Sequence, residues 1–526
     1  MEELRAVLKK LKAGKATGVD EIMAEWMKYG GEKMTYALWV LCNHVWLTEA
    51  CPEQWGQGAI CLLFKDGDKC DSLNYRGITL LSVVGKVFAS LVNVRLMAHC
   101  EKGDRLVDEQ AGFRKGRACA DQIFILREVL TARRGKKQTF TCFIDVKKAY
   151  DRVSRDGLWA ALWEKDVRGK MWRVLRNYYA KVQSCVIVNG ERSDWFGIDV
   201  GVRQGCVLSP ILFDVFIDGL ARAVKALGLG IKVDAGDPLS LLLYADDVVI
   251  TADTYEDLQK MMNAVNEFCR KARLQLNQGK TKMVVFGQRG LSGRTLKCGD
   301  MMVGEAAEYK YLGLVFEKNG WKKQKEKMVR QARRMAAMAW GMLVQTGKMS
   351  TEGKLTIYKA LVRPHVEYGA EVVDAGAWEE AEVMQRWVGK RILLAGKRIP
   401  DEVAQGELGL LSLRGRRAML RLTFWAKILR MKTGRWVRRV YEAGKAEHEA
   451  KPKSKELGES DARVAGEAGA GGKLEEAADD RGLAGRSPSK SKAVGREAMA
   501  GRHGQEAQAP PLPGVEDGTQ SGRLSG

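Results

Sequence analysis

Hydrophobic and polar residues follow two periods along this chain, and the change between them marks out zones. From about residue 139 to 316, apolar runs typical of strands, such as 139–146 and 241–251, alternate with stretches of helical period such as 255–274. Such alternation within one zone predicts a mixed α+β sheet domain.

The zones on either side have a stronger helical pattern. Residues 1 to about 135 combine helical periods with short strands, including a strand and glycine turn at 60–69 and a long helix at 80–100. From about 321 to 441 the pattern is helical and strongly basic. From residue 451 onward the chain has no aromatic residue and is rich in Ala, Gly, Glu, Lys and Ser. We predict that this tail is disordered, because it cannot bury enough apolar surface to offset the entropy of ordering.

The charge of the chain indicates a polyanionic partner. The 526 residues carry a formal net charge of +22. The tail 451–526 contains equal numbers of basic and acidic residues, so the whole excess belongs to residues 1–450. Nucleic acid is the first expectation for such an excess, and an anionic membrane the second.

The cysteines and the N-terminus bear on the compartment. The 11 cysteines are scattered without the spacing of a zinc site, which predicts reduced thiols and no zinc. The first residues, MEELRAVLKKLK, are charged and do not resemble a signal peptide. No run approaches the roughly 18 uninterrupted apolar residues of a membrane span. We therefore expect a nuclear and cytoplasmic protein without a membrane partner.

Two adjacent aspartates, Asp246 and Asp247, interrupt an apolar run. Burying unpaired carboxylates is costly and the two repel each other. The strand-like flanks predict a hairpin with the pair at its tip, and Asp145 follows another apolar run. Three aspartates at one sheet edge could hold the two Mg²⁺ ions of a phosphoryl-transfer site. Taken alone, an acidic pair at a hairpin tip is more often explained by turn chemistry.

Ordered motifs give these aspartates a context. FIDVKKAYD (143–151), RQGCVLSPILF (203–213) and YADD (244–247) resemble the palm motifs of reverse transcriptases, and their wording is similar to the non-LTR (LINE-type) retrotransposon enzymes. Further segments resemble the flanking motifs of the same enzymes: KATGVD (15–20), NYRGITLLSVVGKVF (74–88), DEQAGFRKGR (108–117), NQGKTK (277–282), YKYLG (309–313), RPHVEYG (363–369) and ELGLLSL (407–413). The resemblance covers about residues 1–430.

The resemblance implies a right-hand polymerase of the α+β class. Its expected parts are an N-terminal extension with fingers (1–135), a palm (136–316, within a core domain of about 60–316), a helical thumb with a basic extension (317–445), and a disordered low-complexity tail (446–526). Because the chain begins at the upstream polymerase motif, we expect the polymerase part without the N-terminal endonuclease of full elements.

The resemblance also implies roles for the palm residues. Asp145, Asp246 and Asp247 match the catalytic carboxylates that bind two Mg²⁺ ions, for which Mn²⁺ can substitute. Val146 would offer a backbone carbonyl to the metal site. Lys280 matches a lysine that protonates the leaving pyrophosphate, with Lys282 as a competing candidate.

Other positions match residues that contact the nucleotide, the primer or the template. Tyr150 matches the steric gate that excludes a 2′-hydroxyl, with an ordinary core aromatic as its alternative. The remaining nucleotide contacts would be Lys65, Arg76, Gln204 and Gly205. The primer and template contacts would be Gly112, Phe113, Arg114, Arg203, Tyr311, Leu312, Gly313, Arg330, Arg333 and Arg334. For Arg203, a phosphate contact and a helix cap are both open, and for the fingers and hairpin residues ordinary packing remains open.

Two basic segments fit nucleic acid as well. Residues 321–343 could be a thumb helix along a duplex or a solvated amphipathic helix. Residues 414–441 interleave basic and aromatic residues, which suits structured RNA, with a membrane-surface helix as the alternative.

The resemblance predicts RNA-directed DNA polymerase activity, with an RNA template, a DNA primer and dNTPs as partners. Two alternatives remain at this point: a catalytically inactive retroelement relic that only binds RNA, and a group II intron maturase-like protein.

Overall fold

The chain folds as a mixture of helices and sheets, in agreement with the predicted α+β class. The computed structural model describes residues 1–65, 67–287, 293–318, 320–346, 349–373, 378–396 and 398–450. The predicted disordered tail lies outside the described residues from 451 onward. Helix α17 runs to Ala450, so regular structure continues past the boundary at 445 that the sequence suggested.

A four-stranded sheet in the order β7-β8-β3-β9 lies at the centre. Its strands are β7 (Leu241–Tyr244), β8 (Asp247–Ala252), β3 (Thr139–Ile144) and β9 (Lys282–Phe286). All neighbouring pairs are antiparallel. Alternate residues along the strands belong to two different hydrophobic cores. Cys142 and Ile250 belong to the larger core, and Phe143 and Val249 belong to the smaller one. Because both faces are covered, these strands are continuous apolar runs in the sequence.

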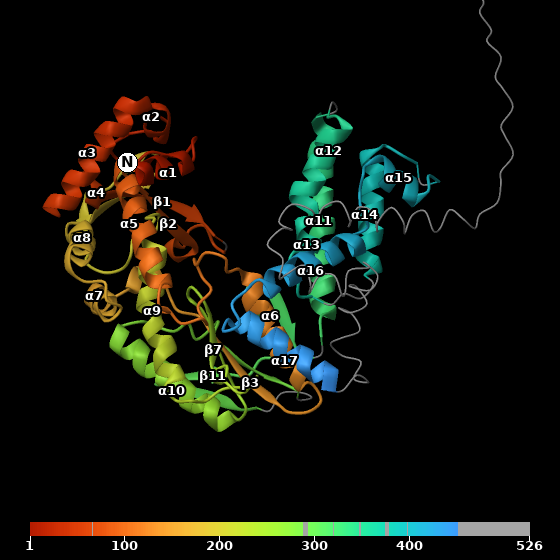
Figure 1. The fold of residues 1–526 in the computed structure, drawn as a ribbon. Coiled ribbons are helices and arrows are strands. Elements are labelled where there is room, and N and C mark those ends of the chain that lie inside the picture. Colours follow the sequence, from red (N-terminus) through yellow and green to blue (C-terminus); the bar gives the residue numbers. More distant parts are fainter. Residues whose placement is uncertain are drawn as a thin grey trace, which may run out of the picture.

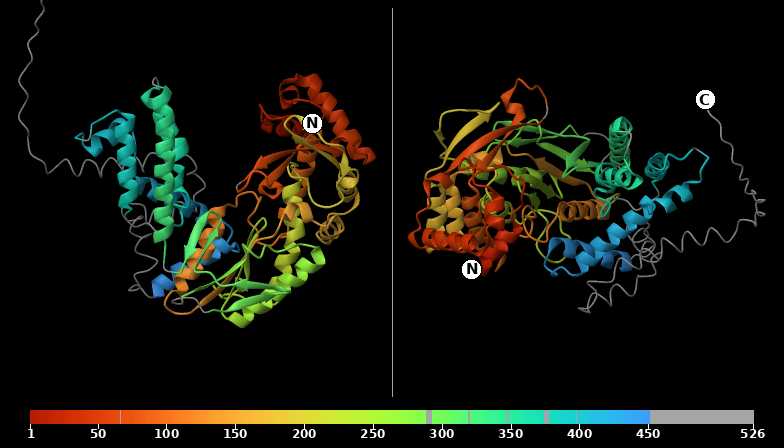
Figure 2. Two further views of the ribbon diagram at one scale, coloured as in Figure 1. Left: turned by 180° about the vertical axis from the view of Figure 1, so that it is seen from behind. Right: turned by 90° about the horizontal axis from the view of Figure 1, so that it is seen from above.

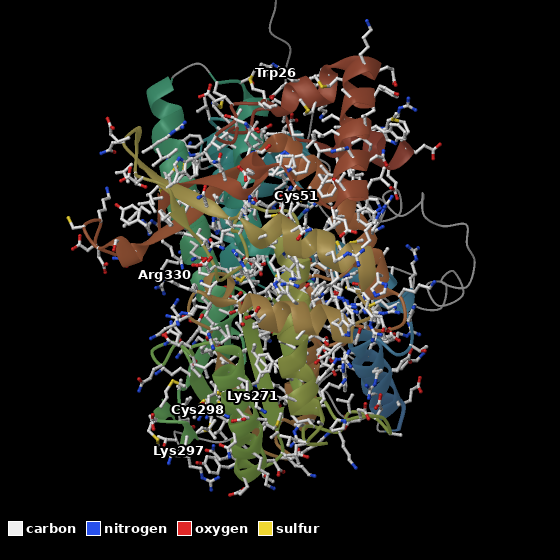
Figure 3. The ribbon with its side chains drawn as sticks, turned by 90° about the vertical axis from the view of Figure 1, so that its left-hand side faces the viewer. Trp26, Cys51, Lys271, Lys297, Cys298 and Arg330 are labelled. Carbon is white, nitrogen blue, oxygen red and sulfur yellow. The ribbon has the colours of Figure 1, made fainter. Side chains whose placement is uncertain are left out.

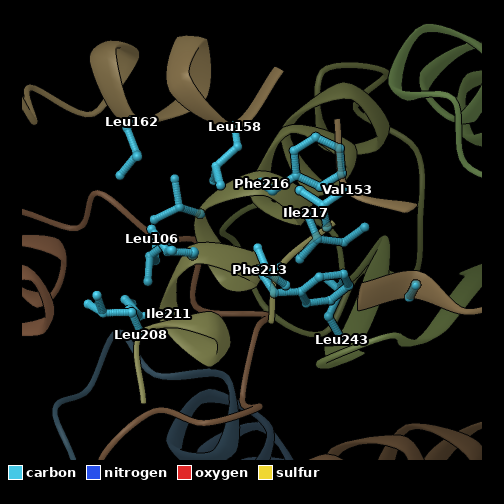
Figure 4. Close-up of a cluster of buried hydrophobic side chains, with 14 of the residues drawn as sticks. Leu106, Val153, Leu158, Leu162, Leu208, Ile211, Phe213, Phe216, Ile217 and Leu243 are labelled. Atoms are coloured by element: carbon cyan, nitrogen blue, oxygen red, sulfur yellow. The ribbon is translucent and has the colours of Figure 1, made fainter. Parts of the chain in front are cut away.

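Helix α9 (Ser209–Lys225) fills the larger core. Figure 4 shows Ile211, Phe213, Phe216 and Ile217 of this helix among Leu158, Leu162 and Leu243. Other helices around this core are α5 (Val83–Glu101), α7 (Arg155–Glu164), α8 (Gly169–Ala180) and α10 (Tyr255–Ala272). This core therefore joins the central sheet to the N-terminal part of the chain.

The second sheet, in the order β2-β1-β4-β5 with β6 paired to β4, joins two N-terminal strands to three strands from within residues 183–197. Its strands are β1 (Gln57–Phe64), β2 (Tyr75–Leu81), β4 (Gln183–Val188), β5 (Glu191–Arg192) and β6 (Phe196–Gly197). The helices beside it are α1 (Glu2–Lys10), α2 (Ala24–Tyr29), α3 (Gly31–Thr48) and α4 (Glu53–Gly56). The strand expected at 60–69 is thus confirmed for its first half, and the long helix expected at 80–100 is α5.

On the other core of the central sheet lie α6 (Cys119–Arg133), the second of two hairpins and the last two C-terminal helices, whereas the first hairpin packs on the larger core. The hairpin strands are β10 (Thr295–Cys298), β11 (Met301–Gly304), β12 (Glu308–Tyr311) and β13 (Leu314–Glu317). The helices are α11 (Lys322–Thr346), α12 (Thr351–Ile357), α13 (Pro364–Glu367), α14 (Glu379–Ile392), α15 (Asp401–Glu407), α16 (Leu413–Leu429) and α17 (Trp436–Ala450). Helices α6 and α17 lie side by side (Figure 2).

The arrangement positions two lobes around the central sheet. In Figure 1, helices α1–α5 with β1 and β2 rise on one side of this sheet and α11–α15 on the other. Helices α11 and α14 share a third, separate core that includes Met328, Tyr358 and Met384. The tip of the β7–β8 hairpin lies in the sheet that joins the two lobes.

Among the described residues, one helix, α5, is long and apolar enough to cross a membrane by length and composition. Half of its most apolar window is buried inside the protein, and Val87, Val92 and Leu96 lie in the larger core. Core helices commonly pass this test, so the finding is weak evidence for a membrane segment.

The core packing predicts a clear difference between two leucine substitutions. Leu158→Ala removes a side chain that is 0% exposed and should lower the free energy of unfolding by about 2–5 kcal/mol, because a cavity remains. Leu47→Ala, at a position 69% exposed, should change it by less than about 0.5 kcal/mol. Urea unfolding followed by circular dichroism checks both, and equal effects would contradict this packing.

Candidate active site

The acidic pair lies at a tight turn between two paired strands. Tyr244 pairs with Asp247, which leaves Ala245 and Asp246 as the two turn residues. Ala245 has a φ of 57°, in the left-handed region that residues other than glycine rarely adopt. The hairpin predicted from the apolar flanks is confirmed.

Asp145 lies beside this turn because of the strand register. Ile144, the last residue of β3, pairs with Val248 on the antiparallel strand β8. The next residue, Asp145, therefore lies opposite Asp247. Asn277 holds Asp145 in two ways: its backbone N–H donates to the Asp145 carbonyl at 2.8 Å, and its side-chain amide donates to Asp145 Oδ2 at 2.8 Å. The hydroxyl of Thr281 accepts from the Asp145 N–H at 3.3 Å. The carboxylate therefore has a fixed orientation.

The three carboxylates affect one another electrostatically. Burial raises the pKa of Asp246, and the charge of Asp145 raises it further. Burial and the charges of Asp246 and Asp145 raise the pKa of Asp247 to about 6. Like charges within a few ångströms of each other produce such shifts. The site therefore holds negative charge that the protein only partly compensates.

Such a site fits a hard divalent cation, though not as a closed cage. Among the residues that the structure describes, no group of three or more His, Cys, Asp and Glu side chains could enclose a metal ion. Mg²⁺ commonly takes one or two carboxylates and completes its shell with waters and substrate phosphates. Val146 and Leu276 form an antiparallel bridge, in which the neighbouring residues make the hydrogen bonds. The Val146 carbonyl accepts neither of these bonds. An open set of oxygen donors results.

Cations from the N-terminal sheet face the carboxylates. The positive charges of Arg76 and Lys65 lower the pKa of Asp246 against the effect of burial. Both side chains are exposed, and they lie near the tip of the hairpin of β1 and β2. Arg76 Nε lies 3.5 Å from Gln204 Oε1. An anionic ligand could therefore contact Arg76 and Lys65 of one sheet and, at the same time, a metal ion held by the carboxylates of the other sheet.

The Gln204–Gly205 turn lies against β2. The Thr79 N–H donates to the Gln204 carbonyl at 2.9 Å, and the Gln204 side chain donates to Asp151 at 2.7 Å. Gly205 has a φ of 114°, and a Cβ there would lie 2.5 Å from the Thr79 carbonyl oxygen. Only glycine permits this approach.

Tyr150 lies between the carboxylates and the core. Its ring stacks on Phe213, with centroids 4.9 Å apart, and Phe113 approaches edge-on at 6.3 Å. Its hydroxyl is buried and has no hydrogen-bond partner among the described residues. Burial and the charges of Asp214 and Asp246 raise the pKa of Tyr150. The ring is therefore held rigidly near Asp246.

The two lysines of the NQGKTK segment differ in their surroundings. Lys280 is exposed, and its charge lowers the pKa of Asp247. Lys282 lies in β9, paired with Phe143, and is half-buried. Lys280 is thus the lysine whose charge reaches the carboxylates.

Three of the expected nucleic-acid contacts are buried instead. Arg114 forms a two-bond ion pair with Glu101 at 2.8 Å and donates to the Val107 carbonyl. Arg203 donates to the carbonyls of Trp55 and Gln57, which corrects both the phosphate contact and the helix cap expected from the sequence. Tyr311 is 2% exposed and packs against Phe143. These side chains support the site from within, because the two guanidinium groups donate to carbonyls inside the protein and the Tyr311 ring packs on Phe143.

Other expected contacts remain at the surface. Phe113 is 48% exposed. Leu312 and Gly313 form the tight turn between β12 and β13, with φ of 44° and 88°, and Tyr368 donates to the Leu312 carbonyl at 2.6 Å. On α11, Arg330, Arg333 and Arg334 are exposed, and Figure 3 shows Arg330 at the edge of the molecule. Gly112 packs against the acidic turn, where a Cβ would lie 2.3 Å from the Ala245 nitrogen.

The basic segment 414–441 is mostly engaged within the protein. Arg421 is buried and donates to the Val373 carbonyl, and Arg417 lies over the Trp378 ring. Further cations of this segment form ion pairs with acidic residues elsewhere: Arg416 with Glu367, Lys427 with Asp121, Arg435 with Asp108 and Asp121, and Arg439 with Asp234. For these residues the observed partners attach α16 and α17 to the rest of the protein, and the RNA contact that the sequence suggested stays a prediction.

Two polar residues of the site were not singled out from the sequence. Asn277 lies in the NQGKTK segment, in which only the lysines had a predicted role, and it bonds to Asp145. Gln110 lies in the DEQAGFRKGR segment and bonds to the acidic turn. An amide side chain carries no charge signal, so only its place beside Asp145 or Ala245 reveals its role.

The close approach at Gly205 makes a testable prediction. Gly205→Ala should lower the free energy of unfolding by at least about 1 kcal/mol, because it combines an unfavourable φ with a clash against the Thr79 carbonyl. Gly197→Ala is the matched control, since a Cβ there meets no atom within 4 Å. Chemical denaturation of both variants measures the difference, and equal stability would contradict the geometry of the turn.

Comparison with known proteins shows what parts of this chain are similar to. Residues 65–316 match the family described as reverse transcriptase (RNA-dependent DNA polymerase). The chain is 25% identical over 379 residues to a probable RNA-directed DNA polymerase from transposon X-element of Drosophila melanogaster, covering 70% of this chain and 41% of that protein. It is 26% identical over 391 residues to the RNA-directed DNA polymerase from mobile element jockey of Drosophila funebris, covering 72% and 42%.

A solved structure of apo telomerase from Candida tropicalis is similar with a TM-score of 0.41, at 14% identity over 81% of this chain and 74% of that chain. The chain spans about two fifths of the length of the two Drosophila relatives. Residues 65–316 are thus similar to reverse transcriptases, and about 70% of the chain is similar to the RNA-directed DNA polymerases of these two Drosophila mobile elements.

Proposed function

We propose that this chain is an RNA-directed DNA polymerase that adds dNMP to the 3′-hydroxyl of a DNA primer, with RNA as template. The observation that carries the proposal is the meeting of Asp145, Asp246 and Asp247 at one sheet edge, within electrostatic reach of Arg76 and Lys65. Carboxylates for a metal and cations for a triphosphate are the two parts that phosphoryl transfer requires.

The proposed division into fingers, palm and thumb follows the lobes around the central sheet. The sheet of β1 and β2 with its cations would be the fingers, the β7-β8-β3-β9 sheet the palm, and α11 the first helix of the thumb. The exposed Arg330, Arg333 and Arg334 would contact the primer–template duplex. These contacts would be electrostatic and independent of sequence.

Reverse transcriptases generally use Mg²⁺. Here Asp145, Asp246, Asp247 and the Val146 carbonyl would hold two ions, with Mn²⁺ able to replace them. When bound, the ions would neutralise charge on the attacking oxygen and the triphosphate. Asn277 would keep Asp145 oriented for this purpose, and Arg76 and Lys65 would bind the phosphates.

The protein's place in the cell is also a proposal. The cysteines of the described residues are free thiols, which suits a reducing compartment. We propose that the chain acts in the nucleus and cytoplasm, where its RNA and DNA partners occur.

The acidic pair gives the first test. The double variant Asp246→Asn, Asp247→Asn should reduce extension of a DNA primer on an RNA template by more than about 100-fold, because the two asparagines lack the negative charge that would bind the metal ions. Asp253→Asn, on the same chain just after β8 and paired with Arg133, should retain activity within about fivefold. The readout is primer extension by the full chain with dNTPs and Mg²⁺.

Activity in both variants would contradict the assignment of the carboxylates. A wild-type chain that binds RNA in a salt-dependent way but never extends a primer would identify an inactive relic instead. Both results are distinguishable in one experiment if binding and extension are measured together.

Tyr150 gives a second test. Tyr150→Val should lower the preference for dNTP over rNTP by about 10- to 100-fold, because the ring that would clash with a 2′-hydroxyl is removed. Tyr150→Phe should keep the preference, since the ring remains and the hydroxyl has no partner among the described residues. The measurement is the ratio of kcat/KM for the two nucleotides, and an unchanged ratio in Tyr150→Val would exclude the gate.

A further inference from the structure

A short segment of the chain, residues 108–112, runs along the outer side of β7. Gln110 bridges Leu243 in a parallel sense. The Leu243 N–H donates to the Glu109 carbonyl at 3.0 Å, and the Ala111 N–H donates to the Leu243 carbonyl at 2.9 Å. The segment therefore extends the central sheet by a few residues next to the acidic hairpin.

The side chain of Gln110 reaches the turn itself. It is 1% exposed. Its Oε1 accepts from the Ala245 N–H at 3.0 Å and from the Gly112 N–H at 2.8 Å, and its Nε2 lies 3.5 Å from the Ala245 carbonyl. The amide thus contacts both sides of residue 245, as a neighbouring backbone would.

Ala245 needs such a partner. Its φ of 57° costs a non-glycine residue about 1–2 kcal/mol. A strained conformation persists only when its surroundings enforce it. Asp246 follows Ala245 directly, so the backbone angles at 245 set the direction of the Asp246 carboxylate.

We propose that Gln110 is a positioning residue that holds the Ala245 turn and thereby aims Asp246 at the metal site. Gln110 contacts neither substrate nor metal and acts through the Ala245 backbone. This inference rests on the proposed polymerase function and deepens it by adding a residue from outside the palm motifs.

The segment is held on its other side by the C-terminal helix. The backbone N–H of Trp436 donates to Asp108 at 2.7 Å, and its indole N–H donates to Glu109 at 2.9 Å. Lys225 of α9 pairs with Glu109 at 2.6 Å. Gln110 is therefore anchored to two helices, one of which lies beyond the matched residues 65–316.

Gln122 of α6 provides a matched control, because its side chain bonds to the same segment. It is also 1% exposed, and its amide donates to the carbonyls of Glu109 and Leu243 at 2.7 and 3.0 Å. It supports the same backbone pairing but has no contact with Ala245 among the described residues. The substitutions Gln110→Met and Gln122→Met remove the same chemical group from equally buried sites.

We expect Gln110→Met to lower kcat for nucleotide addition by about 10- to 100-fold in the full chain, because small misplacements of catalytic groups have effects of this size. The KM for dNTP and the affinity for primer–template should change less than threefold. Gln122→Met should leave kcat within about threefold. Gln110→Asn, which keeps the amide but is one methylene too short, should reproduce the kcat loss and serves if Gln110→Met does not fold.

A second measurement does not depend on activity. Amide hydrogen exchange in the peptide that spans 241–250 should accelerate in Gln110→Met and stay unchanged in Gln122→Met, because only Gln110 protects the Ala245 N–H. Equal kcat losses in the two variants, or a rise in KM in place of a fall in kcat, would overturn the inference. If the wild type extends no primer, the proposed function fails, while the exchange experiment still decides whether Gln110 holds the turn.

Discussion

The mutual repulsion of three carboxylates at one sheet edge is the constraint on which the rest of the structure depends. Burial and neighbouring charge both raise the pKa of Asp246 and Asp247, so this edge is unfavourable for the isolated protein. The surrounding structure keeps it in place: paired strands fix the register, Asn277 orients Asp145, and Gln110 contacts the turn. Cations from the opposite lobe compensate part of the charge. These contacts keep the three carboxylates together at one edge despite their repulsion.

The basic residues of the chain divide into two groups with different tasks. Arg114 and Arg203 are buried and bind backbone carbonyls, and the cations of α16 and α17 pair with carboxylates of distant segments. These contacts join the N-terminal, central and C-terminal parts. Arg76 on β2 and the arginines of α11 are exposed. The part of the charge available for nucleic acid is therefore smaller than the net charge of +22 suggests.

Several elements could be predicted from local pattern because a local cause produces them. The acidic hairpin follows from two apolar runs with a two-residue interruption, and helices α5 and α11 follow from their period and length. The roles of Arg114, Arg203 and Tyr311 could not be predicted in the same way. Their motif suggests a surface contact, whereas their partners Glu101, Trp55 and Phe143 come from other elements.

The sequence by itself determined the class of fold, the order of the motifs and the three aspartates with the family that they resemble, since each is carried by residue type and spacing along the chain. Only the tertiary structure decided which charges are available and what holds the turn. Gln110 is 135 residues from Ala245, and Trp436 is 327 residues from Glu109. Contacts over such separations depend on how the elements pack, and uncharged amides or indoles leave no local pattern that predicts them.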